Sequence, residues 1–498
     1  MTYDAVVIGS GFGGLTAGAL LARYGRKVLI LESHSIPGGA GHSFVREGFH
    51  FDSGPSFHCG LSDPKSLNPL RQVLALLGES IKAVPYDPFA HYHFERVTFP
   101  VHGNSQRYQE AIAEITPQGA KEYRRFEERM LPMYEALRSI PLLALRGDLG
   151  LIGTLLSGYL GPTLKLLPLV GNLQSSAGQI LERDVRDPWV RRLINLECFL
   201  LSGLTAHQTV APEVAFMLGE RANSVVDYPL GGGGALVDAL VRGLERFGGR
   251  LRLSSHVAEI CLSSGRATGV RLKDGEVIPA KIVISNASLW NTYTDLLPPQ
   301  FQGRNLSTPA VDSFMHLHLG IQSQGLEGLS GHHVVIGSGE LSQPGNTCMI
   351  SIPSVWDSSL APPGHHVVHV YSLEPFAPWR RDGDYENRKL ERSAPLYCAL
   401  ERIIPDLRSR IVLDLIGTPL THARYLRRYR GTYGPARMAE IGKFPGSGTP
   451  IQGLYRVGDS TIPGIGVPAV VASAILCVNS LVRPEETTKL IDLLRDKE

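Results

Sequence analysis

Several common signatures are missing from this chain of 498 residues. Its six cysteines are scattered, with no C-x-x-C pair and no Cys/His cluster at metal-ligand spacing, so we expect reduced thiols and no metal site. The formal net charge is only +2, which gives no reason to expect a nucleic acid as a partner. No Ser/His/Asp triad and no pair of acids in a glycosidase context can be picked out. The chemistry is therefore expected to rest on a cofactor.

An uninterrupted apolar helix is also missing, although residues 149–171 are apolar over the length of a membrane span. Gly161, Pro162 and Pro168 would break a helix there, and Lys165 adds a charge near its middle. The pattern favours two short apolar helices that lie in a membrane interface. An internal helical lid is the alternative interpretation.

The strongest positive pattern occupies the first forty residues. An apolar run at 5–8 predicts a buried parallel strand, residues 15–24 predict a helix, and residues 28–31 predict a second buried strand. The turn between the first strand and the helix reads G-x-G-x-x-G. Glu32 ends the second strand 18 residues after Gly14. Strand, turn, helix, strand and acid in this order are typical of a dinucleotide-binding unit.

Each glycine of that turn has an expected task. Gly9 permits the tight turn, Gly11 lets a pyrophosphate approach the backbone, and Gly14 lets the helix pack closely on the strands. The phosphates would lie at the helix N-terminus, where free N–H groups and the dipole favour anions. The carboxylate of Glu32 would accept hydrogen bonds from a ribose diol.

Two more motifs follow closely, Pro37-Gly38-Gly39 and Phe51-Asp52-Ser53-Gly54-Pro55. A dinucleotide unit followed by these motifs resembles the flavin-binding start of the phytoene desaturase and carotenoid isomerase family, within the wider amine-oxidase-like flavoproteins. The resemblance implies FAD as the cofactor, since simple NAD dehydrogenases lack the second motif.

A matching motif lies near the other end of the chain, Val457-Gly458-Asp459, followed by a Pro/Gly loop and an apolar helix. The resemblance implies that Asp459 lies on the ribityl or pyrophosphate side of FAD. It also implies that the N-terminus of the following helix lies near the flavin O2, where a positive helix end stabilises reduced flavin.

The resemblance also implies which residues surround the flavin. Val257 would place backbone groups near the adenine, and Asn286 would end a strand that faces the cofactor. The expected cofactor contacts are Gly9, Gly11, Phe12, Gly13, Gly14, Glu32, Ser33, Gly38, Gly39, Ala40, Val257, Asn286, Gly458, Asp459, Gly466 and Val467. Asp52, Tyr433 and Glu440 are candidate catalytic residues, one of which would steer a proton. Alternatively, Asp52 caps its turn, Tyr433 only walls the pocket and Glu440 is solvated.

Two histidines in the second half of the chain share one face of a predicted strand. His316 and His318 alternate with apolar residues in this segment. No carboxylate accompanies them at metal spacing, so we predict no metal there.

The predicted fold class is α/β, with a discontinuous Rossmann-type FAD-binding domain, an α+β substrate domain and an apolar helical lid. The FAD-binding domain comprises residues 1–75, 222–296 and 444–498. The substrate-binding sheet domain comprises 76–105 and 297–443, and the helical, membrane-associating region comprises 106–221.

Segments 416–425 and 431–435 resemble the carotenoid isomerase and retinol saturase branch of the family. The resemblance implies an FAD-dependent oxidoreductase that acts on a long hydrophobic polyene, with cis-to-trans isomerisation by reduced flavin as the expected reaction. Desaturation, retinol-type saturation and, from another class, a lipid or pigment binding protein with structural FAD stay open. The expected partners are the polyene, a membrane lipid surface, and a quinone or other electron partner. The expected location is peripheral to a membrane, facing the cytoplasm or a plastid compartment.

Overall fold

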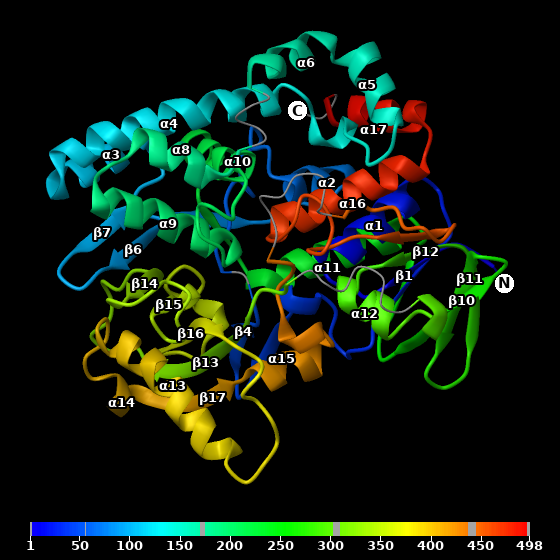
Figure 1. Ribbon diagram of the computed structural model, residues 1–498. Helices are drawn as coiled ribbons and strands as arrows, with labels where there is room; N and C mark the ends of the chain where they lie inside the picture. The colour runs from blue at the N-terminus through cyan, green and yellow to red at the C-terminus, as the bar shows by residue number, and fades with distance from the viewer. Residues whose placement is uncertain (1, 55, 170–174, 302–308, 437–444, 496–498) are drawn as a thin grey trace.

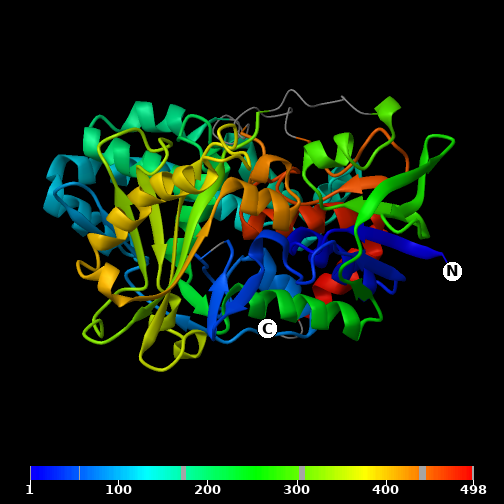
Figure 2. The ribbon, with the colours of Figure 1, turned by 90° about the horizontal axis from the view of Figure 1, so that it is seen from below.

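The computed structural model describes residues 2–54, 56–169, 175–301, 309–436 and 445–495. Two seven-stranded sheets organise the chain. Figure 2 shows them in separate halves of the molecule, with the N-terminal strands in one half and the strands of the middle of the chain in the other.

The first sheet has the order β10-β11-β12-β1-β2-β9, and β18 also pairs with β12. Its central strands β12, β1 and β2 are parallel, with Ala5 opposite both Ile282 and Val28. The strands of this sheet are β1 (Tyr3–Ile8), β2 (Val28–Leu31), β9 (Arg250–Arg252), β10 (Val257–Ser263), β11 (Arg266–Leu272), β12 (Val277–Ser285) and β18 (Leu454–Arg456). It therefore combines the first, middle and last parts of the chain.

Helices close the first sheet on one face. α1 (Phe12–Arg23) packs between α11 (Gly232–Arg246) and α16 (Val467–Leu481), and α2 (Pro69–Leu77) lies beside them (Figure 1). Nearly all of α1 is buried, because its Ala- and Leu-rich surface faces strands on one side and helices on the other. The apolar residues of these elements share one core.

The second sheet has the order β17-β13-β16-β15-β14-β6-β7. Its strands are β6 (Ala90–His93), β7 (Thr98–Val101), β13 (Ser313–Gln322), β14 (His332–Ile336), β15 (Thr347–Ser351), β16 (His365–Glu374) and β17 (Ile411–Gly417). All neighbours pair antiparallel except β14 and β6. On one face Met315, Leu317 and Leu319 pack against α13 (Tyr385–Glu401) and α14 (Leu407–Arg410).

A helical layer covers the opposite face of the second sheet, where Phe314 joins its core. Its members are α3 (Ser105–Ile115), α4 (Pro117–Arg138), α8 (Ala177–Asp184), α9 (Pro188–Ser202) and α10 (Ala211–Asn223). The charged stretch 106–138 thus belongs to two helices whose apolar sides are buried.

Two short apolar helices, α5 (Gly150–Gly158) and α6 (Leu160–Leu166), lie at the edge of the molecule near α17 (Pro484–Arg495) (Figure 1). Within the described residues, no helix is both long and apolar enough to cross a membrane. The remaining elements are β3 (Ser43–Arg46), β4 (Phe49–Asp52), β5 (Ala83–Pro85), β8 (Asp227–Pro229), α12 (Leu289–Thr294) and α15 (Pro419–Leu426).

Candidate cofactor and active site

Two helices begin at the candidate site without a side-chain cap. The N-caps of α1 and α16 are Gly11 and Gly466, and no described side chain accepts a hydrogen bond from either first turn. The first N–H groups of a helix need an acceptor, and the helix dipole favours a negative one. The two predicted cofactor-binding turns therefore keep free donors for an anionic group, which fits a dinucleotide flavin.

Asn286 joins the two turns. Asn286 directly follows β12, and its backbone N–H donates a hydrogen bond to Ile8 O (2.9 Å). A Cβ atom on Gly11 or Gly13 would lie 2.9 or 2.8 Å from its side-chain amide, and one on Gly458 would lie 2.7 Å away. Small residues are thus required here partly because the side chain of Asn286 fills the space between the N-terminal and C-terminal motifs.

The third glycine has the task predicted for it. A Cβ atom on Gly14 would lie 2.1 Å from the carbonyl oxygen of Gly9, so only glycine lets the helix start this close to the preceding strand. Phe12, beside it, is buried with its ring against Gly41.

Glu32 is buried at the end of β2 and held by four hydrogen bonds. Its Oε2 accepts from the backbone and the hydroxyl of Ser10, both at 2.8 Å. Its Oε1 accepts from His34 N (2.8 Å) and from the hydroxyl of Ser33 (3.3 Å). Two of the four donors are hydroxyl groups that can rotate, so a ribose diol could take their place while the backbone donors keep the carboxylate oriented.

The second glycine pair lies against the first turn. Gly11 and Gly38 form an isolated parallel bridge, and Gly38 N donates to Ser10 O (3.0 Å). Gly38 and Gly39 both have positive φ, 113° and 56°, which favours glycine. Ala40 follows in the same turn. Val257, at the start of β10, is buried in the cluster that contains Leu31, next to Glu32.

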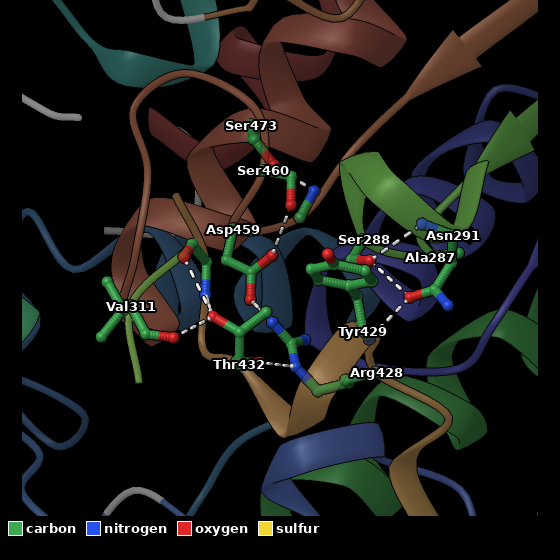
Figure 3. A network of polar contacts seen from close by, with 12 residues as sticks. Ala287, Ser288, Asn291, Val311, Arg428, Tyr429, Thr432, Asp459, Ser460 and Ser473 are labelled. Atoms are coloured by element: carbon green, nitrogen blue, oxygen red, sulfur yellow. Dashed lines mark hydrogen bonds and ion pairs between the residues drawn. The ribbon is translucent and has the colours of Figure 1, made fainter. Parts of the chain in front are cut away.

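Asp459 lies in a polar network that connects the two halves of the molecule (Figure 3). It forms an ion pair with Arg428, which also donates to Thr432 O. The hydroxyl of Thr432 donates to Val311 O (2.5 Å). The C-terminal motif is therefore bound to the segment after α15, as well as to the N-terminal turn.

Asp52 lies at the N-terminus of a third helix, α11. Its carboxylate accepts hydrogen bonds from Ser43 Oγ (2.5 Å), Gly233 N (2.9 Å) and Tyr228 OH (3.3 Å). Burial raises the pKa of Asp52, and these hydrogen bonds partly oppose that rise. The first turn of α11 is thus supplied with an acceptor, unlike those of α1 and α16. Within the described residues the donors to this carboxylate are Ser43, Tyr228 and Gly233, so it caps a distant helix rather than its own turn.

The other two candidate catalytic residues are Tyr433 and Glu440. Tyr433 is partly buried, with its ring 4.6 Å from that of Phe314 and 5.6 Å from that of His422. Burial raises the pKa of its phenol, which therefore stays protonated. Glu440 lies outside the described residues. The structure brings Tyr433 and Asp459 close together, whereas Asp52 faces α11.

The sequence did not predict that histidines from three elements meet beside Tyr433. His316 and His318 share one face of β13, as expected. His369 on β16 and His422 on α15 join them. The ligand atoms of His316, His318 and His369 lie within 4.8 Å of one another, a spacing that a metal ion could bridge, and the expectation of no metal there stays a prediction. The alternation in 365–373 could have indicated His369, but only the strand pairing shows the meeting.

Comparison with known proteins agrees with this architecture. The model of the flavin containing amine oxidoreductase family matches residues 12–481. A chloroplastic prolycopene isomerase of Daucus carota is 36% identical, over 96% of this chain and 79% of its own. A neurosporene-forming phytoene desaturase of Rhodobacter capsulatus is 28% identical over 95% of this chain and 92% of its own.

Among solved structures, a putrescine oxidase bound to putrescine superposes with a TM-score of 0.62 at 15% identity, covering 99% of both chains. This likeness concerns the fold: a Rossmann-like sheet together with a substrate-domain sheet. With the family model spanning nearly the whole chain, the protein belongs to the flavin containing amine oxidoreductases.

Proposed function

We propose that this protein binds FAD and isomerises a long polyene from cis to trans. The observation that carries the proposal is full-length similarity, at 33–36% identity, to proteins named prolycopene isomerases from Daucus carota and Arabidopsis thaliana. Proteins named phytoene desaturases are more distant, at 28% for Rhodobacter capsulatus.

The residues at the site fit the proposed cofactor. The uncapped first turn of α1 would hold the pyrophosphate, and Glu32 would hold a ribose. The uncapped start of α16 would place a positive helix end at the flavin. When bound in its reduced state, FAD supplies electrons to the conjugated chain and takes them back, which transiently lowers the double-bond order.

The chain's own part in this reaction is to exclude water and fix orientation. Phe314, Tyr371 and Tyr433 pack their rings against one another on one side of the second sheet. These aromatic and apolar walls suit a hydrocarbon, which offers no hydrogen bonds for a polar site to recognise.

An exposed apolar surface on α5 and α6 suits a lipid membrane as the source of such a substrate. Its members are Leu149 (86% exposed), Ile152 (59%), Leu156 (61%), Leu160 (50%) and Leu164 (54%). Their spacing places them along adjoining helix faces. We assign the bilayer interface as their occupant, in preference to an internal lid, because side chains this exposed do not pack inside the chain.

Liposome flotation tests the membrane surface. Leu156→Ser together with Leu160→Ser should lower binding to phospholipid vesicles at least about 30-fold, because each loses about 1–2 kcal/mol of apolar burial in the interface and each 1.4 kcal/mol is a factor of ten. The matched control is Leu390→Ser on α13, which is 61% exposed but lies elsewhere. Equal flotation of the double variant and the control would contradict the assignment.

Product analysis tests the reaction. Holoenzyme with reduced or oxidised FAD is incubated anaerobically with poly-cis carotenes in liposomes, and product masses are recorded. We expect all-trans products of unchanged mass only with reduced FAD. A loss of two hydrogens would indicate a desaturase and a gain of two a saturase, whereas a flavin that no reductant reduces would indicate a binding protein. Equal rates with oxidised FAD would rule out the proposed chemistry.

A further inference from the structure

Four buried histidines gather on the face of the second sheet that also carries Tyr433. His316 and His318 come from β13, His369 from β16 and His422 from α15. They are between 2% and 8% exposed. Apolar residues could pack equally well beside these aromatic rings, so packing alone does not explain four imidazoles here.

Three of the four imidazoles are joined end to end. His422 Nε2 lies 2.5 Å from His316 Nε2, and His316 Nδ1 lies 2.8 Å from His369 Nε2. The planes of neighbouring rings differ by 23° and 10°. The N–H and the lone pair of imidazole both lie in the ring plane, and the planes of these rings are nearly parallel. At the His316–His369 junction the ring centroids are 5.1 Å apart, so the two bonded nitrogens lie nearly in line between the rings, whereas the centroids of His316 and His422 are closer, at 4.4 Å.

Within the part of the protein that the structure describes, this row of three hydrogen-bonded imidazoles has an unpaired nitrogen at each end. The Nδ1 atoms of His369 and His422 are buried, and neither has a hydrogen-bond partner among the described residues. A buried polar atom without a partner costs stability, typically about 1–3 kcal/mol, unless a molecule outside the chain supplies one. Each end is therefore a place where a proton can be received or given up.

The tautomer of each ring determines the direction in which the N–H···N hydrogen bonds point. Burial holds the pKa of His422 down to about 3 and keeps those of His316 and His369 well below the usual range, so all three rings are neutral. Each neutral ring carries one N–H and one lone pair. If both hydrogen bonds point the same way, one end presents an N–H and the other a lone pair.

His318 stands outside the chain although it is stacked on His369 at 4.4 Å. Its Nε2 is hydrogen-bonded to the carbonyl oxygen of Asp52 at 3.2 Å. A metal would compete with the chain, because both nitrogens of His316 are already used in hydrogen bonds. The in-line geometry thus favours proton transfer over metal binding.

We propose that His422, His316 and His369 form a proton relay that serves the polyene site; this rests on the proposed function. One proton enters at the lone pair of one end, the two bridging protons each shift to the neighbouring ring, and one proton leaves the N–H at the other end. Every ring changes tautomer, none gains charge, and nothing is oxidised or reduced. The His369 end takes the proton up, and the His422 end, whose ring lies 5.6 Å from that of Tyr433, delivers it.

The relay resets only if the proton returns. After one transfer all three tautomers are inverted, and the chain cannot carry a second proton in the same direction until it is reversed. The proposed isomerisation has no net gain or loss, so a proton lent to the polyene together with the electrons is returned with them, and each turnover restores the starting tautomers. A reaction with net transfer of hydrogen would leave the relay inverted.

The first test is nuclear magnetic resonance of the wild-type holoenzyme with ¹⁵N-labelled histidine. We expect two ring N–H protons shifted downfield of the others, each coupled to imidazole nitrogens, and both lost in His316→Gln. Metal analysis of the same sample should find no stoichiometric metal. Absence of the two signals, or a retained metal ion, would overturn the relay even if no variant folds.

The second test is kinetic. Gln at position 316 can still donate and accept, but it does not relay a proton, so kcat should fall about 100-fold with little change in KM. The solvent deuterium isotope effect on kcat should change from a curved to a linear dependence on deuterium content. The control is His332→Gln, since His332 is buried in the same sheet and bonds to Tyr86, Ser351 and the backbone of Phe89, all outside the relay.

The two proposals fail separately. If the downfield signals are missing while carotene isomerisation proceeds, the relay is wrong and the proposed function stands. If the signals are present but no polyene is isomerised, the proposed function is wrong. A folded, flavin-loaded His316→Gln with wild-type kcat and a curved isotope dependence would also overturn the relay.

Discussion

The two sheets treat buried polar groups in opposite ways. At the parallel strands of the first sheet, Glu32 has four donors around its two oxygens, and the free groups are backbone N–H at two helix starts. In the antiparallel second sheet, neutral imidazoles bond to one another and leave open nitrogens at both ends. The first arrangement suits a fixed anionic ligand, and the second suits a mobile proton.

The two sites also differ in how far apart their residues lie in the sequence. The features of the first sheet come from short motifs, whereas His316, His369 and His422 are brought together by strand pairing and by α15. Substitutions in the first sheet should therefore impair cofactor binding, whereas substitutions in the second sheet should impair proton transfer.

The largest effect is expected from Gly14→Ala. The new Cβ would lie 2.1 Å from a backbone oxygen that cannot move without the strand, so we expect a loss of at least about 3 kcal/mol in the free energy of unfolding and no bound flavin. The matched lesion in the second sheet is Gly320→Ala, whose Cβ would lie 2.5 Å from the ring of Phe49. It should cost about 1–3 kcal/mol and leave flavin bound. Denaturant unfolding and flavin absorbance measure both, and equal flavin loss would erase the contrast.

Next in size are Glu32→Ala and Asp459→Ala. Removing Glu32 takes away the acceptor proposed for the ribose and leaves Ser10 N and His34 N without theirs, so flavin affinity should fall about 100-fold. Asp459→Ala frees Arg428, and we expect a fall of about tenfold. Fluorescence titration with FAD measures the affinities. Unchanged FAD affinity in both variants would contradict the assignment of these residues to the cofactor.

The smallest effect concerns a carboxyl group in the helical layer over the second sheet. Burial raises the pKa of Glu213 from 4.5 to about 8, and its buried Oε2 has no partner within the described chain. A raised folded-state pKa means that stability is fully present below pH 4.5 and is lost as pH rises towards 8. Glu213→Gln should match wild type at pH 4.5 and exceed it by about 1–3 kcal/mol at pH 9. A constant difference across this range in urea unfolding would show that the carboxyl is solvated.

Much of the first sheet could be predicted from the sequence, because its period and its turns are local. The strand predicted at 28–31 is β2, residue for residue. The strand expected to end at Asn286 is β12, which begins at Val277 and pairs antiparallel with β11 before it runs parallel to β1. The prediction gave no helix at Pro69–Leu77, although Asn68 caps it and Pro69 begins it.

The candidate site divides in the same way. The close packing at Gly14 could be predicted from the motif, and a Cβ atom there would indeed lie 2.1 Å from Gly9 O, whereas the ribose contact of Glu32 stays a prediction. Arg428 could not be linked to Asp459, because their contact joins segments of different predicted domains. The roles of Tyr433 and Asp52 and the division into three domains stay predictions.

The position of β18 has a consequence for biosynthesis. The sheet that carries the N-terminal turn takes its last strand from residues 454–456, and α16, whose first turn is proposed to face the flavin, ends at Leu481. A ribosome making this chain must therefore have translated nearly all of it before the cofactor cradle can close. Until α16 has been translated, the face of α1 that packs against it stays exposed. Flavin binding is therefore a late step, and the exposed apolar helix makes the nascent chain prone to aggregation before then.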